Sequence, residues 1–455
     1  MLAPALDMML RGCKIYQYER MSGVAKLPRR RDIIQSCLDE FATAQWGKGL
    51  NPNSPKQMKD FFYEALGLPE QHKFDKGVRK VTTNRDALEK LKAYYYAIPV
   101  IECILALRDT LKKISVLNTE VDSDGRMRTS YNVAGTETGR WSSSANAFGG
   151  GTNLQNITSE LRRVFIADKG KKLCYLDLEQ AESYVVGLLT WMVTGDGSYL
   201  DACQSGDLHT TVCKLVWPGL PWVGDKKGDR AVADQRFYRQ YSYRDMGKRG
   251  GHGSNYYGKP PTMAKHLKVE TSLMETFQRG YFGAFPGIRG WHLWVAQQLG
   301  IHQTLTTPLG RRRTFFGRPD DDATLREAIA FVPQSTVGDL LNFILYKFFI
   351  EEKRAELLAQ IHDAIVFQYD ERLEAEILPA ALKRARVTVT VESIKHPGQF
   401  RSITIPSECK VGWNWADEEI TTSLGKKLKN PNGLRKWRGE PDERRRLEGL
   451  DRPIS

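Results

Sequence analysis

Two aspartates stand at the ends of apolar runs that lie far apart in the chain, and their positions suggest metal chemistry. Asp177 closes a run typical of a buried strand, and Asp363 follows His362 between two strand-like runs. Each has a plainer explanation, since such an aspartate often caps a helix or makes a turn. Mg²⁺, however, prefers one or two carboxylates plus substrate phosphates. Two such ions, roughly 3.5–4 Å apart, can clamp a phosphoryl group during its transfer.

The residues around each aspartate predict the elements that position it. Residues 172–178 are strand-like, and the apolar residues from Ala181 onward follow helical spacing. Asp177 is therefore predicted to lie where a strand ends and a helix follows. Residues 357–369 form two strand-like runs around a polar pair that includes Asp363, which predicts a tight hairpin. Both carboxylates are therefore expected at strand ends, where they can converge on one metal pair.

A second group of residues is cationic. Arg244 and Lys248 are four residues apart and share one face of a predicted helix, and His252 and Tyr256 continue the same stripe. That face can meet a triphosphate, which carries several negative charges. Gly250, Gly251 and Gly253 in the same stretch are poor helix formers, so we expect this helix to be short or frayed without substrate.

The composition narrows the class of protein. The chain has 455 residues and a formal net charge of +13. This length predicts more than one subdomain, and the charge suggests a polyanionic partner, although a merely basic surface would give the same charge. The cysteines are scattered without a Cys-x-x-Cys pair, which argues against a zinc site and a secreted disulfide framework. No apolar run looks long enough for a membrane span, so we expect a soluble, cytoplasmic protein.

Several stretches, taken in order, resemble the polymerase portion of family A DNA polymerases, the group of bacterial DNA polymerase I and many phage replicases. The stretch Asp177-Leu-Glu-Gln-Ala-Glu182 is similar to that family's first metal motif, and Ile361-His-Asp-Ala364 to its second. Two further blocks agree, namely Thr136-Glu-Thr-Gly-Arg-Trp-Ser-Ser-Ser144 followed by Asn153-Leu-Gln-Asn-Ile157, and Arg244-Asp-Met-Gly-Lys248 with Tyr256. The resemblance covers residues 1–417 and favours a phage-type replicase.

The resemblance implies an α+β fold of the right-hand polymerase type, with an antiparallel palm sheet and a largely helical thumb and fingers. It divides the chain into a segment leading into the palm (1–22), the thumb (23–125), the first part of the palm (126–190), the fingers (191–310) and the second part of the palm (311–417). Residues 418–455 lie beyond the family's usual end, and their alternating charges predict a flexible basic tail.

The resemblance also implies roles for individual residues. Asp177 and Asp363 would hold two Mg²⁺ ions, which Mn²⁺ can replace, with a further ligand from the Leu178 carbonyl. Lys248 would act in catalysis by offsetting charge on the phosphates, and Glu182 would exclude a 2′-hydroxyl. The residues expected to bind the incoming dNTP are Gln180, Glu182, His209, Arg244, Lys248, His252 and Tyr256. Those expected to contact primer–template DNA are Lys112, Lys113, Arg140, Asn153, Gln155, Asn156, Gln334 and His362.

These roles imply a template-directed DNA polymerase that adds dNTPs to a primer 3′-end, without a 3′→5′ exonuclease in this chain. We expect a monomer, with any exonuclease, clamp or helicase acting in trans. Departures from the family pattern, among them Ala364, Glu179, Tyr184, Tyr257 and His252, support one alternative: a catalytically weak or inactive nucleic-acid-binding relative. A two-metal nuclease is a further reading, but it leaves the cationic helix face without a purpose.

Overall fold

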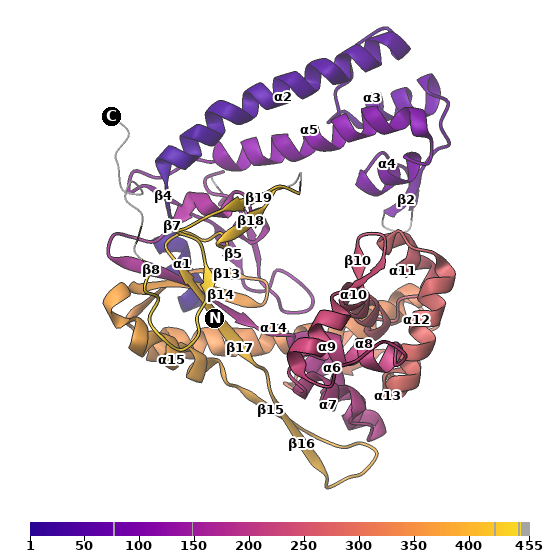
Figure 1. The fold of residues 1–455 in the computed structure, drawn as a ribbon, viewed down its shortest axis with the longest axis vertical. Coiled ribbons are helices and arrows are strands. Elements are labelled where there is room, and N and C mark those ends of the chain that lie inside the picture. The colour runs from indigo at the N-terminus through magenta and orange to yellow at the C-terminus, as the bar shows by residue number, and fades with distance from the viewer. Residues whose placement is uncertain (76–77, 148, 423–424, 445, 447–455) are drawn as a thin grey trace.

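The computed structural model describes residues 1–75, 78–147, 149–422, 425–444 and 446. Within these residues, a five-stranded sheet lies at the centre (Figure 1). Its order is β13 (Ala355–Ile361), β14 (Ala364–Asp370), β8 (Lys171–Leu178), β17 (Ser407–Gly412) and β20 (Arg435–Lys436). Every neighbouring pair is antiparallel, which confirms the expected palm sheet.

The palm sheet is buried on both faces because its side chains alternate. Cys174 and Leu176 of β8 join a core made with helices, whereas Leu173 packs into a second core on the opposite face. The helices that join the first core include α1 (Leu2–Arg11), α6 (Ala181–Thr194), α14 (Asp322–Glu351) and α15 (Glu374–Ala385). The second core is formed with a small antiparallel sheet, β4 (Arg126–Met127), β1 (Cys13–Ile15) and β7 (Phe165–Ile166).

Helix α14 departs from the expectation that no stretch approaches membrane-spanning length. Among the described helices, it alone is long and apolar enough to cross a bilayer, but 72% of its most apolar window is buried inside the protein. Asp321 caps its start by accepting from the backbone N–H groups of Ala323 and Thr324, at 3.1 Å each. Its apolar composition is therefore that of a core helix.

The expected thumb has a core of its own. Two long helices, α2 (Gln17–Trp46) and α5 (Ile98–Leu117), lie side by side, and buried side chains such as Leu38, Phe61 and Ile104 fill the space within this unit (Figure 1). The Ser54 hydroxyl caps α3 by accepting from the backbone N–H of Gln57. The remaining elements are α3 (Pro55–Lys59), a π-helical turn (Asp60–Ala65), β2 (His72–Asp75), β3 (Val78–Val81), α4 (Arg85–Leu91) and a 3₁₀ turn (Tyr95–Ala97).

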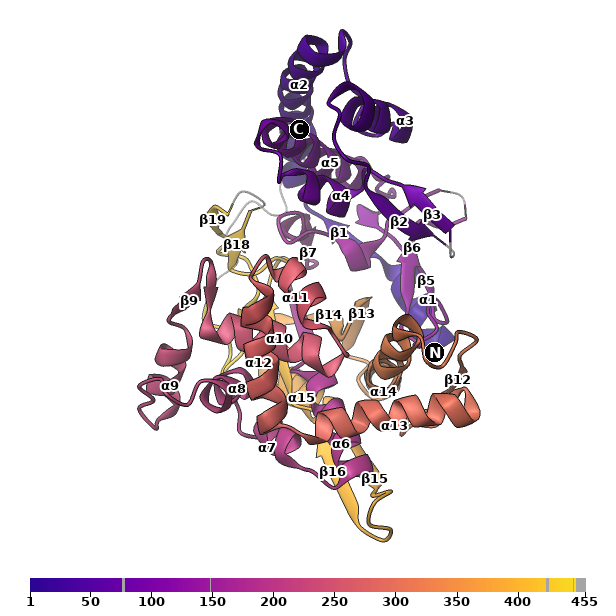
Figure 2. The same cartoon turned by 90° about the vertical axis from the view of Figure 1, so that its right-hand side faces the viewer.

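The expected fingers are mostly helical and share the first core with the palm. Phe277 and Trp291, which are fully buried, belong to that shared core. The elements are α7 (Ser198–Gln204), α8 (Leu208–Val216), α9 (Lys226–Ala233), β9 (Arg236–Tyr238), β10 (Tyr241–Ser242), α10 (Tyr243–Asn255), α11 (Pro260–Leu267), α12 (Thr271–Ala284) and α13 (Gly287–His302). Fingers and thumb approach each other at their tips (Figures 1 and 2), where Lys268 Nζ lies 3.0 Å from Glu89 Oε2.

Hairpins and short segments complete the described chain. The hairpins are β5 (Ser130–Asn132) with β6 (Ser142–Ser144), β11 (Thr304–Thr306) with β12 (Arg312–Thr314), and β15 (Thr388–Glu392) with β16 (Phe400–Thr404), the last of which projects from the palm (Figure 1). The short segments are the 3₁₀ turns Leu154–Asn156, Arg162–Val164 and Glu371–Leu373, and the paired strands β18 (Glu419–Thr421) and β19 (Lys427–Lys429).

The end of the chain differs from the flexible basic tail expected for residues 418–455. Over its described part it folds onto the palm: β20 pairs with β17, and the Trp437 N–H donates to the Cys409 carbonyl at 2.8 Å. Arg444 donates to the carbonyls of Val411 and Gly433, at 2.9 Å each. The charged residues thus satisfy backbone groups at a sheet edge instead of remaining in solvent. Residues 423–424, 445 and 447–455, and Phe148 in the glycine-rich loop, lie outside the described residues.

Candidate active site

The two predicted aspartates come together at one end of the palm sheet. Ala364 lies opposite Asp177 in the β14–β8 pair, and the Leu178 N–H donates to the Asp363 carbonyl at 3.3 Å. The predicted hairpin is present, with His362 in the left-handed region at φ 52°. Asp177 does not cap the following helix; α6 has Gln180, at φ 55°, as its N-cap residue, so the capping explanation is excluded.

Asp177 lies in an acidic environment. Burial, together with the neighbouring carboxylates of Glu408 and Asp363, raises the pKa of Asp177 to about 6. Within the described residues, its carboxylate accepts no hydrogen bond from a side chain. Burial likewise raises the pKa of Asp363, although the Arg140 guanidinium opposes that rise. The pair therefore has less positive charge around it than two ionised carboxylates require.

A bridge of polar side chains links the second aspartate to the fingers. Arg140 Nη2 lies 2.6 Å from Glu182 Oε1 and 3.2 Å from Asp363 Oδ1. The Tyr256 hydroxyl donates to Glu182 Oε2 at 2.5 Å, and burial together with that carboxylate holds the pKa of Tyr256 well above its usual value. Arg140, expected at the DNA, thus contacts Glu182 and Asp363 in this structure, because these two side chains present it with two negative charges.

The cationic stripe lies on α10, which is a regular 13-residue helix and not the short or frayed one expected from its glycines. Ser242 and Asp245 form a reciprocal capping box at its start. The glycines permit close packing: a Cβ at Gly250 would lie 2.5 Å from the Phe277 ring, and one at Gly247 would lie 3.0 Å from Cys213 Sγ. Neighbouring helices α8 and α12 therefore hold α10 in place, which offsets its weak intrinsic propensity.

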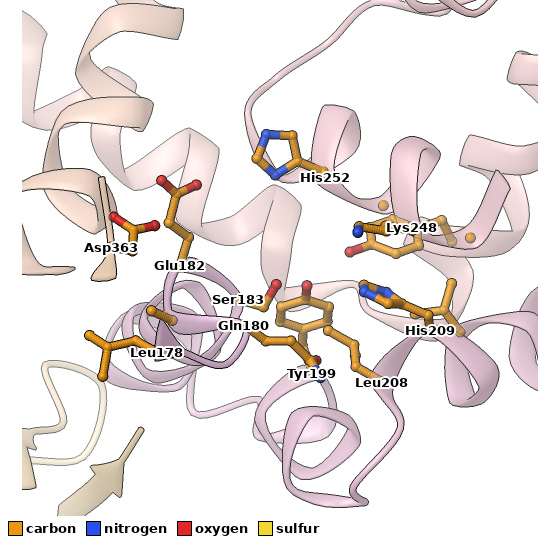
Figure 3. A pocket seen from close by; sticks show the side chains of 15 residues that line it. Leu178, Gln180, Glu182, Ser183, Tyr199, Leu208, His209, Lys248, His252 and Asp363 are labelled. Atoms are coloured by element: carbon orange, nitrogen blue, oxygen red, sulfur yellow. The ribbon is translucent and has the colours of Figure 1, made fainter. Parts of the chain in front are cut away.

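A pocket of about 280 Å³ separates the carboxylates from the cations. Figure 3 shows Asp363 and Glu182 on one side of it, and Lys248 and His209 on the other. Lys248 is exposed and, within the described part of the chain, has no ion-pair partner, whereas Arg244 Nη2 lies 3.1 Å from Asp207 Oδ1. Asp207 also caps α8, so it fixes Arg244 to the helix that carries His209.

His209 contributes no positive charge at neutral pH. Burial, followed by the nearby charges of Arg244 and Lys248, lowers the pKa of His209 to about 4. The neutral imidazole can still donate one N–H to a phosphate oxygen. His252 is exposed at the pocket, and its ring centroid lies 4.8 Å from that of Tyr256 in an edge-on arrangement.

The residues expected to contact DNA are divided between exposed and buried positions. Lys112, Asn156 and His362 are exposed, and Gln334 is half-buried on α14. Lys113 instead forms a buried ion pair with Glu160, because it lies on the inner face of α5. Gln155 is buried and donates to Gln360 Oε1 at 2.7 Å, and Asn153 Oδ1 accepts from Ser143 at 2.7 Å. The buried side chains shape the loop that precedes β7.

The donor set of the site fits a metal that arrives with a phosphate ligand. Among the described residues, no group of three or more His, Cys, Asp or Glu side chains could hold a metal ion by itself. Asp363 nevertheless lines the pocket, and Asp177 lies opposite Ala364, the residue that follows Asp363. The raised pKa values of the two aspartates indicate carboxylates that a cation would stabilise. Mg²⁺ commonly takes one or two carboxylates and completes its shell with water and phosphate oxygens.

Two site residues were missed in the sequence. Glu408 lies directly opposite Asp177 in the β17–β8 pair, on the side away from Ala364. Tyr199 lines the pocket floor, and its hydroxyl accepts from Asn255 Nδ2 at 2.8 Å. The alternation around Glu408 indicates a strand, but no feature of the sequence gives the register of that strand against β8.

A palm sheet with paired aspartates, facing a helix with paired cations, defines the right-hand polymerase class of fold. The family profile described as DNA polymerase family A matches residues 31–417, and the chain therefore belongs to that family. The curated relatives include the thermostable DNA polymerase I of Thermus aquaticus, 31% identical over 363 residues, which are 72% of this chain and 38% of that protein. DNA polymerase I of Chloroflexus aurantiacus is 28% identical over 452 residues, covering 92% of this chain and 42% of its own.

A solved structure shares the fold. The POL domain of Pol1 from M. smegmatis, in complex with DNA primer-template and dNTP, superposes with a TM-score of 0.68 at 23% identity, covering 91% of this chain and 70% of that one. This likeness confirms the expected α+β right-hand fold. The chain spans about two fifths of the length of the curated relatives, at 38% and 42% of the two proteins named above.

Proposed function

We propose that this chain is a template-directed DNA polymerase that transfers a nucleotide from a dNTP to a primer 3′-end. The observation that carries the proposal is a pocket lined by Asp363 on one side and by Lys248 on the other. Asp177 lies beside Asp363 at the end of the sheet, and Arg244 lies on the same helix as Lys248. The primer hydroxyl attacks the α-phosphate, a new phosphodiester bond forms, and pyrophosphate leaves. This reaction requires negative charge to be offset on both sides of the phosphorus.

The cations of α10 bind the triphosphate in this scheme. Lys248 reaches the phosphates as a mobile ammonium, while Arg244 is pre-oriented by Asp207. His209 adds a neutral N–H. Two Mg²⁺ ions held by Asp177, Asp363 and the Leu178 carbonyl would lower the pKa of the primer hydroxyl and stabilise the leaving oxygens.

Glu182 and its partners set the sugar side of the pocket. The bond from Tyr256 and the contact with Arg140 fix both oxygens of the Glu182 carboxylate. A 2′-hydroxyl placed against this fixed carboxylate would meet groups that are already paired, so the site favours a deoxyribose. Arg140, in turn, orients Asp363.

A primer-extension gel with Mg²⁺ and dNTPs tests the proposal. Elongation directed by the template supports a polymerase, whereas an unchanged primer points to an inactive nucleic-acid-binding relative and a shortened one to a nuclease. The expected partners are primer–template DNA and dNTPs, and the expected place of action is the cytoplasm.

A further inference from the structure

The described residues beyond the family match bring a lysine to the catalytic edge of the palm sheet. Strand β20 pairs with β17, which places Lys436 opposite Lys410. Two further hydrogen bonds hold this part of the chain against β17. The Trp437 N–H donates to the Cys409 carbonyl, and Arg444 donates to the Val411 carbonyl. Lys436 is therefore carried by a fixed element, although its own side chain is largely exposed.

Lys436 lies between two carboxylates that flank Asp177. Its Nζ is 2.6 Å from Glu408 Oε2 and 3.2 Å from Glu179 Oε1. Glu408 is opposite Asp177 across the β17–β8 pair, so both side chains leave the same face of the sheet. Glu179 follows Asp177 by two residues, and Ala364, the neighbour of Asp177 on the other side, contributes no carboxylate.

Oxygen clusters of this kind attract divalent cations, because hard cations such as Mg²⁺ and Ca²⁺ bind oxygen ligands that include carboxylates. In this chain, an ammonium group with three donors stands where such a cation would bridge Glu408 and Glu179. The bridging position is thus already taken by a charge that belongs to the protein. Of the three carboxylates at this edge, Glu408 and Glu179 pair with Lys436, whereas Asp177 does not.

We propose that Lys436 is a positioning residue of the metal site. It occupies the position between Glu408 and Glu179, and thereby directs divalent cations to Asp177 and Asp363 instead of to the sheet edge. This inference rests on the proposed function for its consequence in catalysis, but the exclusion of a cation is a property of the protein alone.

The test is a Mn²⁺ titration of the whole chain, without DNA or dNTP, in which free Mn²⁺ is measured by electron paramagnetic resonance. Lys436→Met and Lys436→Gln should each bind one more Mn²⁺ ion per chain than the wild type. Lys436→Arg, which keeps the charge, should match the wild type. Lys427→Met is the matched control, because Lys427 lies on neighbouring β19 and pairs with Glu419 at 2.7 Å. Adding Glu408→Gln to Lys436→Met should remove the additional ion.

Lys436→Gln separates charge from packing, since it keeps a polar side chain on β20 but loses the positive charge. An unchanged number and affinity of Mn²⁺ ions in both Lys436→Met and Lys436→Gln would overturn the proposal, as would an equal gain in Lys427→Met. Primer extension by the wild type, measured in parallel, reports on the polymerase assignment separately. A gain of one Mn²⁺ ion by the Lys436 variants without primer extension by the wild type supports the role of Lys436 and contradicts the polymerase assignment. Primer extension without a gain of one ion supports the polymerase assignment and contradicts the role of Lys436.

Discussion

Replacing Asp177 with asparagine should stabilise the metal-free protein at neutral pH. Burial and the carboxylates of Glu408 and Asp363 raise the pKa of Asp177 from 3.8 to about 6, so the ionised side chain is less favourable in the folded than in the unfolded chain. A shift of this size corresponds to about 3 kcal/mol at most. Because the side chain is partly exposed, and solvent screens its charge, we expect Asp177→Asn to raise the free energy of unfolding by about 1–2 kcal/mol.

The sign of this effect fixes its pH dependence. Between the unfolded pKa of 3.8 and the folded pKa of about 6, the native state binds more protons than the unfolded state, so the cost of Asp177 grows as pH rises. The penalty is complete above the folded pKa and absent below the unfolded one. The stabilisation by Asp177→Asn should therefore fall by about half near pH 5.

Urea unfolding in the presence of a chelator, followed by tryptophan fluorescence, measures the difference. Trp413 and Trp415 are buried beside the palm sheet and report on its unfolding. Asp320→Asn, at an exposed turn, serves as the control and should leave the urea midpoint unchanged at either pH. The reasoning fails if Asp177→Asn is no more stable than the wild type near pH 7.5, or if its gain does not shrink near pH 5. Added Mg²⁺ and dNTP should stabilise the wild type but not the variant.

Three further substitutions test the remaining parts of the site and fold. Glu182→Ala should raise incorporation of UTP relative to dTTP in single-nucleotide kinetics, because it removes the carboxylate that we propose to face the sugar; an unchanged ratio refutes that role. The wild type should accept ddTTP, since His252 presents a polar ring edge at the pocket, and His252→Phe should restore rejection; equal selectivity in both proteins contradicts this. Arg444→Ala should lower the free energy of unfolding by about 2–3 kcal/mol, since three backbone carbonyls lose a charged donor, whereas exposed Arg438→Ala should have little effect.

The sequence predicted the elements that carry the chemistry because their patterns are local. Apolar runs that end at Asp177 and Asp363 indicated strand ends, and the structure pairs those strands in register. The spacing of Arg244 and Lys248 indicated one helix face, and that face borders the pocket. The right-hand α+β fold was implied by the resemblance to family A DNA polymerases, which the structure confirms.

The errors concern features that depend on distant partners. The glycines of α10 suggested fraying, but the close packing of this helix against Phe277 and Cys213 leaves no room for larger side chains and holds the helix in place. The two-residue strand β20 has no sequence pattern of its own, and its charges resemble those of a tail until β17 is placed beside it. The DNA contacts expected of Arg140 and Lys113 stay predictions, but the sequence did not reveal the carboxylates, Glu182 and Glu160, with which these two residues pair in the structure.

The most direct test of the account measures single-nucleotide incorporation into a primer–template by the wild type, Asp177→Ala, Asp363→Ala and the control Asp320→Ala. The binding of each protein to the same DNA is measured alongside. The account predicts Mg²⁺-dependent, template-directed addition by the wild type and the control, and none above background by either aspartate variant, with DNA binding retained by all four. Substantial incorporation by Asp177→Ala or Asp363→Ala, in Mg²⁺ or Mn²⁺, would contradict the assignment of the two carboxylates to the chemical step.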